Sequence, residues 1–110
     1  MMNIRIGVVA LLALFFASGI AHAREQLQIV GSSTVYPFAS FVAEEFGAVS
    51  RYPTPVVEAT GTGGGMKIFC SDNSMSSPDI VNASRRIRIR EMQLCRRNGV
   101  SNITEVMFGY

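Results

Sequence analysis

Residues 31–38, with the sequence GSSTVYPF, constrain the fold more than any other stretch because they join a predicted strand to a predicted helix. The preceding run, residues 27–30, is apolar and β-branched at its end, which indicates a strand. From the end of this stretch onward, bulky apolar side chains recur at helical spacing and are expected to share the inner face of a helix. These side chains are Phe38, Phe41, Val42, Phe46 and Val49.

The polar residues between this strand and helix suit two roles. Backbone N–H groups at a helix N-terminus lack partners and the helix dipole favours negative charge, so the turn predicts an anion site. The same turn also suits a plain helix cap, because Ser and Thr are preferred N-caps and Pro37 is tolerated in the first helical turn. Taken alone, the stretch leaves both interpretations open.

The first 23 residues have the pattern of a secretory signal peptide. Arg5 gives a positive start, residues 6–20 are largely apolar, and Ala-His-Ala follows as a small-x-small cleavage site. The apolar run is shorter than the ~20 residues that a membrane-spanning helix needs. We therefore expect export and cleavage after Ala23.

The 87 remaining residues are enough for one small domain. They carry nine basic and eight acidic residues, and this near balance argues against a nucleic-acid partner. Two cysteines in an exported chain predict a disulfide between Cys70 and Cys95. It would close a loop worth about 3 kcal/mol in the chain-entropy model.

No metal or cofactor is expected. The cysteine spacing fits no zinc or haem pattern, and His22, the single histidine, is removed with the signal peptide. Without a histidine, a Ser-His or Cys-His catalytic pair is impossible, and the carboxylates show no paired pattern. An enzyme is therefore the weaker interpretation.

The plan of strand, small-residue turn and helix occurs twice more. Residues 55–59 predict a strand that runs into the glycine-rich stretch 60–65 and then an apolar helical start. After a polar surface loop at 71–78, residues 79–84 predict a third strand.

The C-terminal part completes this pattern. A helix is expected over residues 89–98, with Gly99 just past its end and Ile89, Met92 and Cys95 on its inner face. The β-branched content of residues 103–108 predicts a fourth strand.

Strands that alternate with helices predict an α/β fold with a mostly parallel sheet. Ligands of such sheets bind outside the carboxyl ends of the strands. The turns 31–37, 60–65 and 82–86 are expected to lie together on that edge.

The glycine run matches neither the P-loop nor the dinucleotide fingerprint, because Met66 occupies the place of the required glycine. Consecutive glycines still let the backbone approach an anion closely, although a flexible linker is the alternative. Arg85 follows the third strand, and its guanidinium can hold an oxyanion through two parallel hydrogen bonds. We interpret Arg86, Arg88 and Arg90 as a solvated face.

Three motifs in this order resemble the periplasmic phosphate-binding proteins of bacterial ABC transporters (PstS type). They are GSSTVYPF, VVEATGTGGGMK and PDIVNASRRI, and the resemblance extends over residues 27–110. It implies a type II periplasmic-binding-protein fold that encloses one dehydrated phosphate in the periplasm and delivers it to a membrane permease. The expected function is phosphate binding for uptake.

The resemblance also implies the contacts. The first motif would bind phosphate through hydroxyl and backbone N–H groups, the glycine motif through its threonine and flanking glycines, and the third through its Ser-Arg pair. The implied phosphate-binding residues are Ser33, Thr34, Val35, Thr62, Gly63, Gly64, Ser84 and Arg85. We expect Ser33, Thr34, Thr62 and Arg85 to be the principal contacts.

Two departures from the family accompany this resemblance. One branch has, at the position of Arg85, an aspartate that accepts the phosphate proton, so Arg85 is expected of an arginine-using branch. Family members also run to several hundred residues, with further contacts from a second lobe. Residues 24–110 are accordingly expected to be the N-terminal part of the first lobe and to present half of a binding cleft.

Three alternatives remain at this point. The chain could serve another tetrahedral oxyanion such as sulfate, molybdate or tungstate. It could be an exported phosphoester-binding or phosphatase-like protein. It could also be a secreted adhesion fragment in which the glycine run is only a loop.

Overall fold

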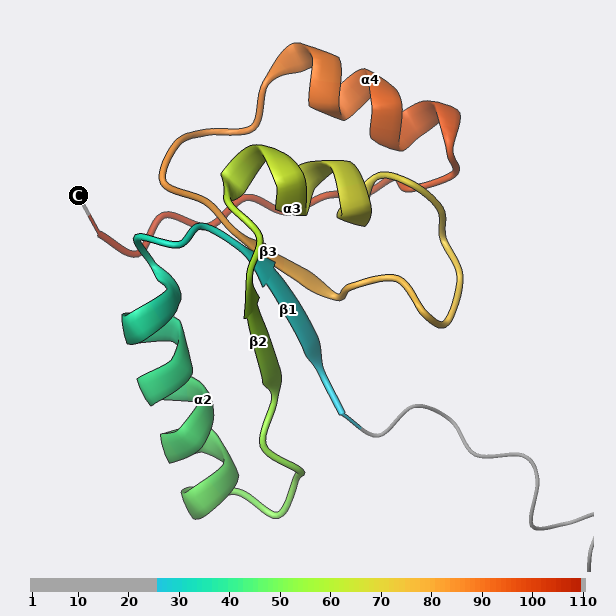
Figure 1. Cartoon of the computed structure of the whole chain (residues 1–110). Coiled ribbons are helices and arrows are strands. Elements are labelled where there is room, and N and C mark those ends of the chain that lie inside the picture. The colour runs from blue at the N-terminus through green and yellow to red at the C-terminus, as the bar shows by residue number, and fades with distance from the viewer. Residues whose placement is uncertain (1–25, 110) are drawn as a thin grey trace, which may run out of the picture.

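The computed structural model describes residues 26–109, which form a three-stranded sheet and three helices (Figure 1). The predicted signal peptide and its cleavage site lie outside the described residues. The elements in chain order are β1 (Gln28–Gly31), α2 (Tyr36–Val49), β2 (Val56–Ala59), α3 (Thr62–Phe69), β3 (Ile80–Asn82) and α4 (Ile89–Arg97).

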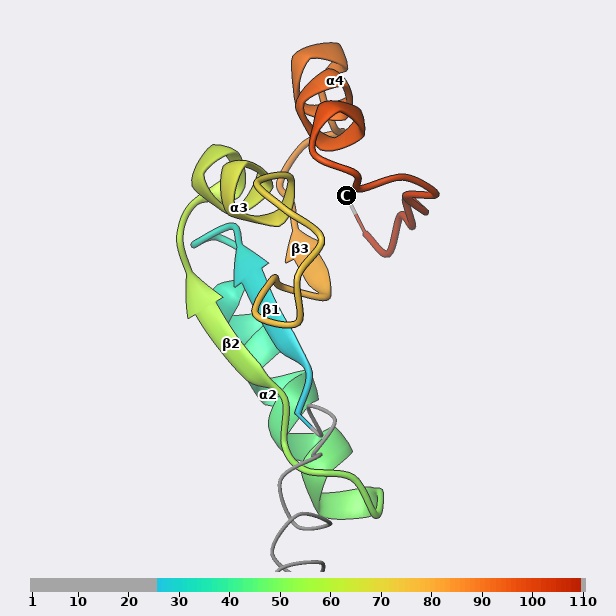
Figure 2. The ribbon, with the colours of Figure 1, turned by 90° about the vertical axis from the view of Figure 1, so that its right-hand side faces the viewer.

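The sheet has the order β2-β1-β3, and both strand pairs are parallel, as Figure 2 shows. Gly31 of β1 is level with Ala59 of β2 and with Asn82 of β3, so the three carboxyl ends lie at one edge. This confirms the expected α/β fold and its parallel sheet.

The two crossovers run in opposite directions across the sheet. The chain passes from central β1 to β2 through α2, and then from β2 back across to β3 through α3. Because such crossovers are right-handed, α2 and α3 cover opposite faces of the sheet. Helix α4 lies beyond α3, away from the sheet (Figure 1). A reversal of this kind is where open α/β sheets bind ligands.

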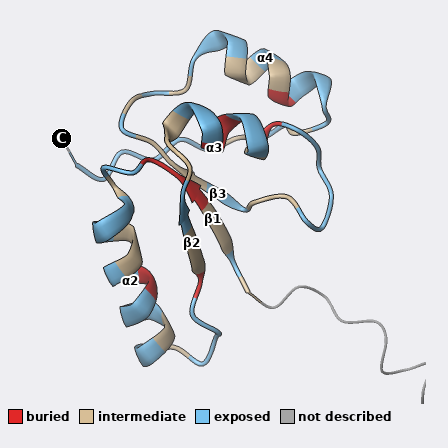
Figure 3. Cartoon of the chain, viewed as in Figure 1, coloured by how far each residue is buried: buried red, intermediate tan, exposed pale blue. Residues whose placement is uncertain are grey.

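Helix α2 packs on the sheet through its small residues and not through its large ones. Ala43 is buried, and Ser40 and Gly47, which lie on the same side, are half-buried. The predicted inner face, with Phe41 as an example at 62% exposed, is largely open to solvent (Figure 3). The prediction was wrong because the small side chains allow the closer approach to the sheet.

Two stacked aromatic pairs lie along this exposed face of α2. The Phe38 and Phe108 rings stack with centroids 5.8 Å apart, and the Phe46 and Tyr52 rings stack at 6.3 Å. The buried apolar core, in contrast, consists of small and medium side chains around the sheet and α3. Its members are Val30, Ala43, Met66, Cys70 and Cys95.

Helix α3 begins earlier than expected, so the glycine run forms its first turns and is not a loop. Its N-cap is Gly61, whose φ of 77° is left-handed and favours glycine. Gly65 is buried against β1, where a Cβ on it would lie 2.7 Å from the Gly31 Cα. The run therefore allows close packing of helix on strand.

Helix α4 ends in a Schellman motif. The Val100 N–H donates to the Cys95 carbonyl at 2.8 Å, and Gly99, with φ of 82°, donates to the Arg96 carbonyl at 3.3 Å. Gly99 thus has the position predicted from the sequence. On the inner face of the helix Cys95 is buried, but Ile89 is 75% exposed, which contradicts its expected place there.

The predicted disulfide is present and fastens α4 to α3. Cys70 is the C-cap residue of α3, it is bonded to Cys95 of α4, and both are fully buried. The Asn98 side-chain amide donates to the Cys70 carbonyl at 2.8 Å and reinforces this junction.

The segment 103–108 is not a strand. It is held by side chains, because the Glu105 carboxylate accepts from the Ile87 N–H at 3.1 Å and Phe108 stacks on Phe38. The strand was predicted from β-branched residues, but their preference for strands comes mainly from packing on a sheet and not from the backbone itself. Among residues 26–109, no helix has the length and apolar character needed to cross a membrane.

Candidate anion-binding site

The three predicted turns meet at the carboxyl edge of the sheet. Backbone hydrogen bonds join them there: the Ser32 N–H donates to the Asn82 carbonyl at 2.8 Å, and the Thr60 N–H to the Gly31 carbonyl at 2.9 Å. Each strand therefore extends into a loop that is fixed to its neighbour. The edge carries one continuous set of small polar residues.

The first turn is held by a residue that the sequence analysis did not single out. Ser32 is buried, and its Oγ accepts from the Val35 N–H at 3.3 Å. Val35, and not a hydroxyl residue, is the N-cap of α2, so the side-chain cap expected from Ser or Thr is absent. Ser33 and Thr34 are exposed at the edge, where both are accessible to a ligand.

The second turn places the N-terminus of α3 at the same edge. The first N–H groups of a helix, here those of Thr62, Gly63 and Gly64, have no intrahelical acceptor. Gly63 and Gly64 are exposed, and neither carries a side chain that would keep an anion from these N–H groups. The positive end of the helix dipole adds to their attraction for an anion.

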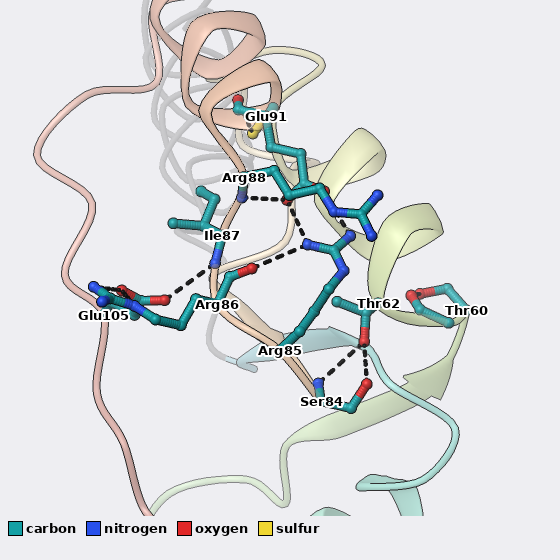
Figure 4. Close-up of polar contacts among 11 residues, drawn as sticks. Thr60, Thr62, Ser84, Arg85, Arg86, Ile87, Arg88, Glu91 and Glu105 are labelled. Atoms are coloured by element: carbon teal, nitrogen blue, oxygen red, sulfur yellow. Dashed lines mark hydrogen bonds and ion pairs between the residues drawn. The ribbon is translucent and has the colours of Figure 1, made fainter.

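Thr62 and Ser84 connect the second and third turns (Figure 4). The Thr62 hydroxyl oxygen accepts from the Ser84 N–H at 3.1 Å and lies 3.2 Å from the Ser84 hydroxyl. A hydroxyl has one donor and two acceptor positions. When the Ser84 hydroxyl also donates to Thr62, the Thr62 hydrogen is available to an anion.

Arg85 is held in place by Glu91 of α4 (Figure 4). Its Nη2 donates to Glu91 Oε1 at 2.6 Å and its Nη1 to Glu91 Oε2 at 3.2 Å. Both side chains are partly buried, at 27% and 16% exposed. The hydrogen bond from Arg85 holds the pKa of the Glu91 carboxyl below its ordinary value, so the carboxylate stays ionised.

The neighbouring Arg86 belongs to the surface. It pairs with Glu105 at 3.0 Å, its side chain is 85% exposed, and this bond lowers the pKa of Glu105. Arg88 and Arg90 are also exposed, as expected of a solvated face. Of these arginines, Arg85 is the one held beside the α3 N-terminus, because a Cβ on Gly63 would lie 3.8 Å from its Nη2.

The structure thus brings Thr62, Gly63, Ser84 and Arg85 together. Ser33 and Thr34 lie on the adjoining loop of the same edge, and the Ser32 bond to β3 connects that loop to the group. Sequence reasoning missed Ser32 and Glu91. For Glu91 a weak signal existed: it stands three residues after the N-cap Arg88, at the spacing of a capping box.

This arrangement offers hydrogen-bond donors to an anion. The donors are hydroxyls, backbone N–H groups and a guanidinium, and the Glu91 carboxylate beside them is engaged by Arg85. Within residues 26–109, no group of His, Cys, Asp and Glu side chains is placed to hold a metal ion. Chemically, the site suits an oxyanion better than a cation.

Comparison with known proteins gives consistent results. Residues 17–110 match the family model of a PBP superfamily domain. Protein SphX of Synechococcus elongatus is 44% identical over 73 residues, which are 66% of this chain and 20% of that protein. Protein SphX of Synechocystis is 41% identical over 76 residues, 69% of this chain and 21% of that protein.

A solved structure is similar as well. It is described as a possible phosphate binding protein from Planctomyces limnophilus and aligns with a TM-score of 0.60 at 35% identity. The alignment covers 71% of this chain and 26% of that structure. The chain therefore spans about a fifth of the length of the curated relatives and a quarter of that of the solved structure.

Proposed function

Since the chain belongs to the PBP (periplasmic-binding-protein) superfamily, we propose that it binds inorganic phosphate as part of the substrate-binding component of a bacterial phosphate ABC transporter. The observation that carries this proposal is the meeting of three donor-rich turns at one edge of the parallel sheet. The likeness to a structure described as a possible phosphate binding protein supports the choice of anion.

Each turn has its own part in the proposed site. The Thr62 and Ser84 hydroxyls and the N–H groups of Gly63 and Gly64 would donate to phosphate oxygens from one side. Arg85 would supply the charge-assisted hydrogen bonds, which are about twice as strong as neutral ones. Ser33, Thr34 and the Val35 backbone would contact the anion from the loop after β1.

Binding, and not hydrolysis, is the proposed activity. Ester cleavage needs a base that can activate water, and the carboxylate that contacts Arg85, Glu91, is engaged by its guanidinium. A chromogenic phosphate ester should accordingly show no turnover. The same proposal includes export to the periplasm, with cleavage of the signal peptide after Ala23. It also includes delivery of the anion to an inner-membrane permease.

Calorimetric titration of the full chain with phosphate, sulfate and molybdate tests this proposal. We expect phosphate to give a saturable heat, and the two competitors to displace it only at higher concentration. Preferred binding of sulfate or molybdate would transfer the assignment to another oxyanion. No saturable heat with any of the three, at concentrations up to tens of millimolar, would contradict it.

A further inference from the structure

We propose that Glu91 is a positioning residue of the anion site. By holding the end of the Arg85 guanidinium, it turns the side-on edge of that group, formed by the Nε–H and one Nη2–H, toward the first turn of α3. This inference rests on the proposed function, because it concerns how the site takes up a tetrahedral oxyanion. It assigns a role in binding to a side chain that would itself not touch the anion.

Three of the five guanidinium hydrogens of Arg85 have acceptors in the structure. A guanidinium has five N–H groups in a fixed planar fork. Glu91 accepts one hydrogen from each terminal nitrogen, and the Arg86 carbonyl accepts the other Nη1 hydrogen at 3.1 Å. Within residues 26–109, the Nε–H and the second Nη2–H have no acceptor. These two form the side-on edge, which matches two oxygens of a tetrahedral oxyanion.

The side-on edge of Arg85 faces the start of α3. Of the Arg85 guanidinium nitrogens, Nη2 alone lies within 4 Å of the position that a Gly63 Cβ would occupy, at 3.8 Å. Figure 4 shows Arg85 between Glu91 on one side and Thr62 and Ser84 on the other. An oxyanion at the α3 N-terminus would therefore meet the side-on edge of Arg85, whereas Glu91 would lie behind the guanidinium.

Glu91 is itself held in place by its neighbours. Its Oε2 accepts from the Arg88 N–H at 3.3 Å, which restrains the carboxylate at the start of α4. Helix α4 is fastened to α3 by the Cys70–Cys95 disulfide, and the Cys70 sulfur lies 3.4 Å from the Glu91 carbonyl oxygen. Glu91 is thus fastened to α3 through Cys70 at the end of that helix, and Arg85 is aligned relative to both helices.

The test compares phosphate affinities by NMR titration at constant ionic strength. Glu91→Gln keeps an acceptor for the Arg88 N–H but loses the charged two-oxygen grip on Arg85, so we expect about tenfold weaker binding, within the usual coupling of residues in one network. Arg85→Lys, which keeps the charge without the fork, should weaken binding similarly. Glu105→Gln is the matched control, since it removes an equal charge from the Arg86 pair and should change affinity less than about twofold.

A double-mutant cycle separates positioning from general destabilisation. In an Arg85→Ala background, Glu91→Gln should have no further effect on phosphate affinity, because the residue through which it acts is gone. An equal loss in both backgrounds, or unchanged affinity of Glu91→Gln alone, would overturn the inference and leave phosphate binding intact. Absence of any phosphate-dependent shift in the wild-type chain would instead overturn the proposed function together with the inference.

Discussion

The Thr62 hydroxyl oxygen lies 3.1 Å from the Ser84 backbone nitrogen and 3.2 Å from the Ser84 hydroxyl, so one side chain joins the start of α3 to the end of β3. The residues are 22 positions apart in the sequence. Their contact closes the small polar edge at which the proposed anion would bind, and when the Ser84 hydroxyl is the donor it leaves the Thr62 hydroxyl hydrogen available to that anion.

Removal of this hydroxyl should weaken phosphate binding. Thr62→Val keeps the shape of the side chain and loses both the bond to Ser84 and the donor to the anion. We expect roughly threefold to tenfold weaker binding, the usual worth of a neutral hydrogen bond. The measurement is a phosphate titration, with Thr62→Ser as the hydroxyl-retaining control. Equal affinities of the valine and serine variants would show that the hydroxyl does not contact the anion.

The packing of α3 on β1 predicts that alanine destabilises the protein at one of two adjacent glycines and not at the other. A Cβ at Gly65 would lie 2.7 Å from the Gly31 Cα, so Gly65→Ala should lower the free energy of unfolding by about 1–3 kcal/mol through overpacking. A Cβ at Gly64 would meet nothing nearer than 3.8 Å, so Gly64→Ala should change stability by less than about 0.5 kcal/mol. Urea unfolding followed by circular dichroism measures both. If the two variants were equally stable, the close contact between helix and strand would be refuted.

Loss of the disulfide should lower stability substantially. Replacing Cys70 and Cys95 with serine removes a cross-link that restricts the unfolded chain, so its conformational entropy rises. We expect the free energy of unfolding to fall by about 3 kcal/mol. It also removes the covalent tie between α3 and α4, in a chain with few large buried side chains. Denaturant unfolding with and without reductant gives the difference. Two reactive thiols in the unreduced protein would contradict this prediction.

The Arg85–Glu91 pair predicts a pH dependence with a definite sign. The folded state lowers the pKa of Glu91 below 4.5, chiefly through its hydrogen bonds from Arg85. Its stabilising effect is therefore complete above that value and is lost as the pH falls through the lower, folded-state pKa. At neutral pH, Glu91→Gln should cost at most about 1 kcal/mol, because the pair is partly solvated.

Unfolding measured between pH 7 and pH 3 checks this sign. The stability difference between wild type and Glu91→Gln should shrink toward the acid end of the range. Glu105 and Asp72 also have lowered pKa values, so the stability of both proteins should fall at acid pH for this shared reason. A difference that stayed constant across the range would mean that the ionised Glu91 does not contribute through Arg85.

Much of this fold can be predicted from sequence, because its strand–turn–helix units are local. The turn before α2, the glycine-rich start of α3 and Gly99 after α4 were each placed within a few residues of the observed elements. The parallel sheet follows from the alternation of strands and helices, and it alone brings the three turns to one edge.

The errors arose where tertiary contacts decide. On α2, bulky residues such as Phe41 predicted the inner face, whereas Ala43 on the opposite side fits against the sheet. Residues 103–108 are held through Glu105 and Phe108 and form no strand. Glu91 could not be assigned to the site because its partner, Arg85, is brought to it by the fold of the loop after β3.

The most direct test of the account is a titration of the ¹⁵N-labelled chain with inorganic phosphate, followed at its backbone amides. We predict saturable shifts at the three turns of the sheet edge, including Ser33, Gly63, Gly64 and Ser84, and no comparable shifts at the far end of α4. NMR detects weak as well as tight binding, so affinity does not limit the result. Saturable shifts absent from these turns, or confined to the basic end of α4 at Arg96 and Arg97, would contradict the proposed site.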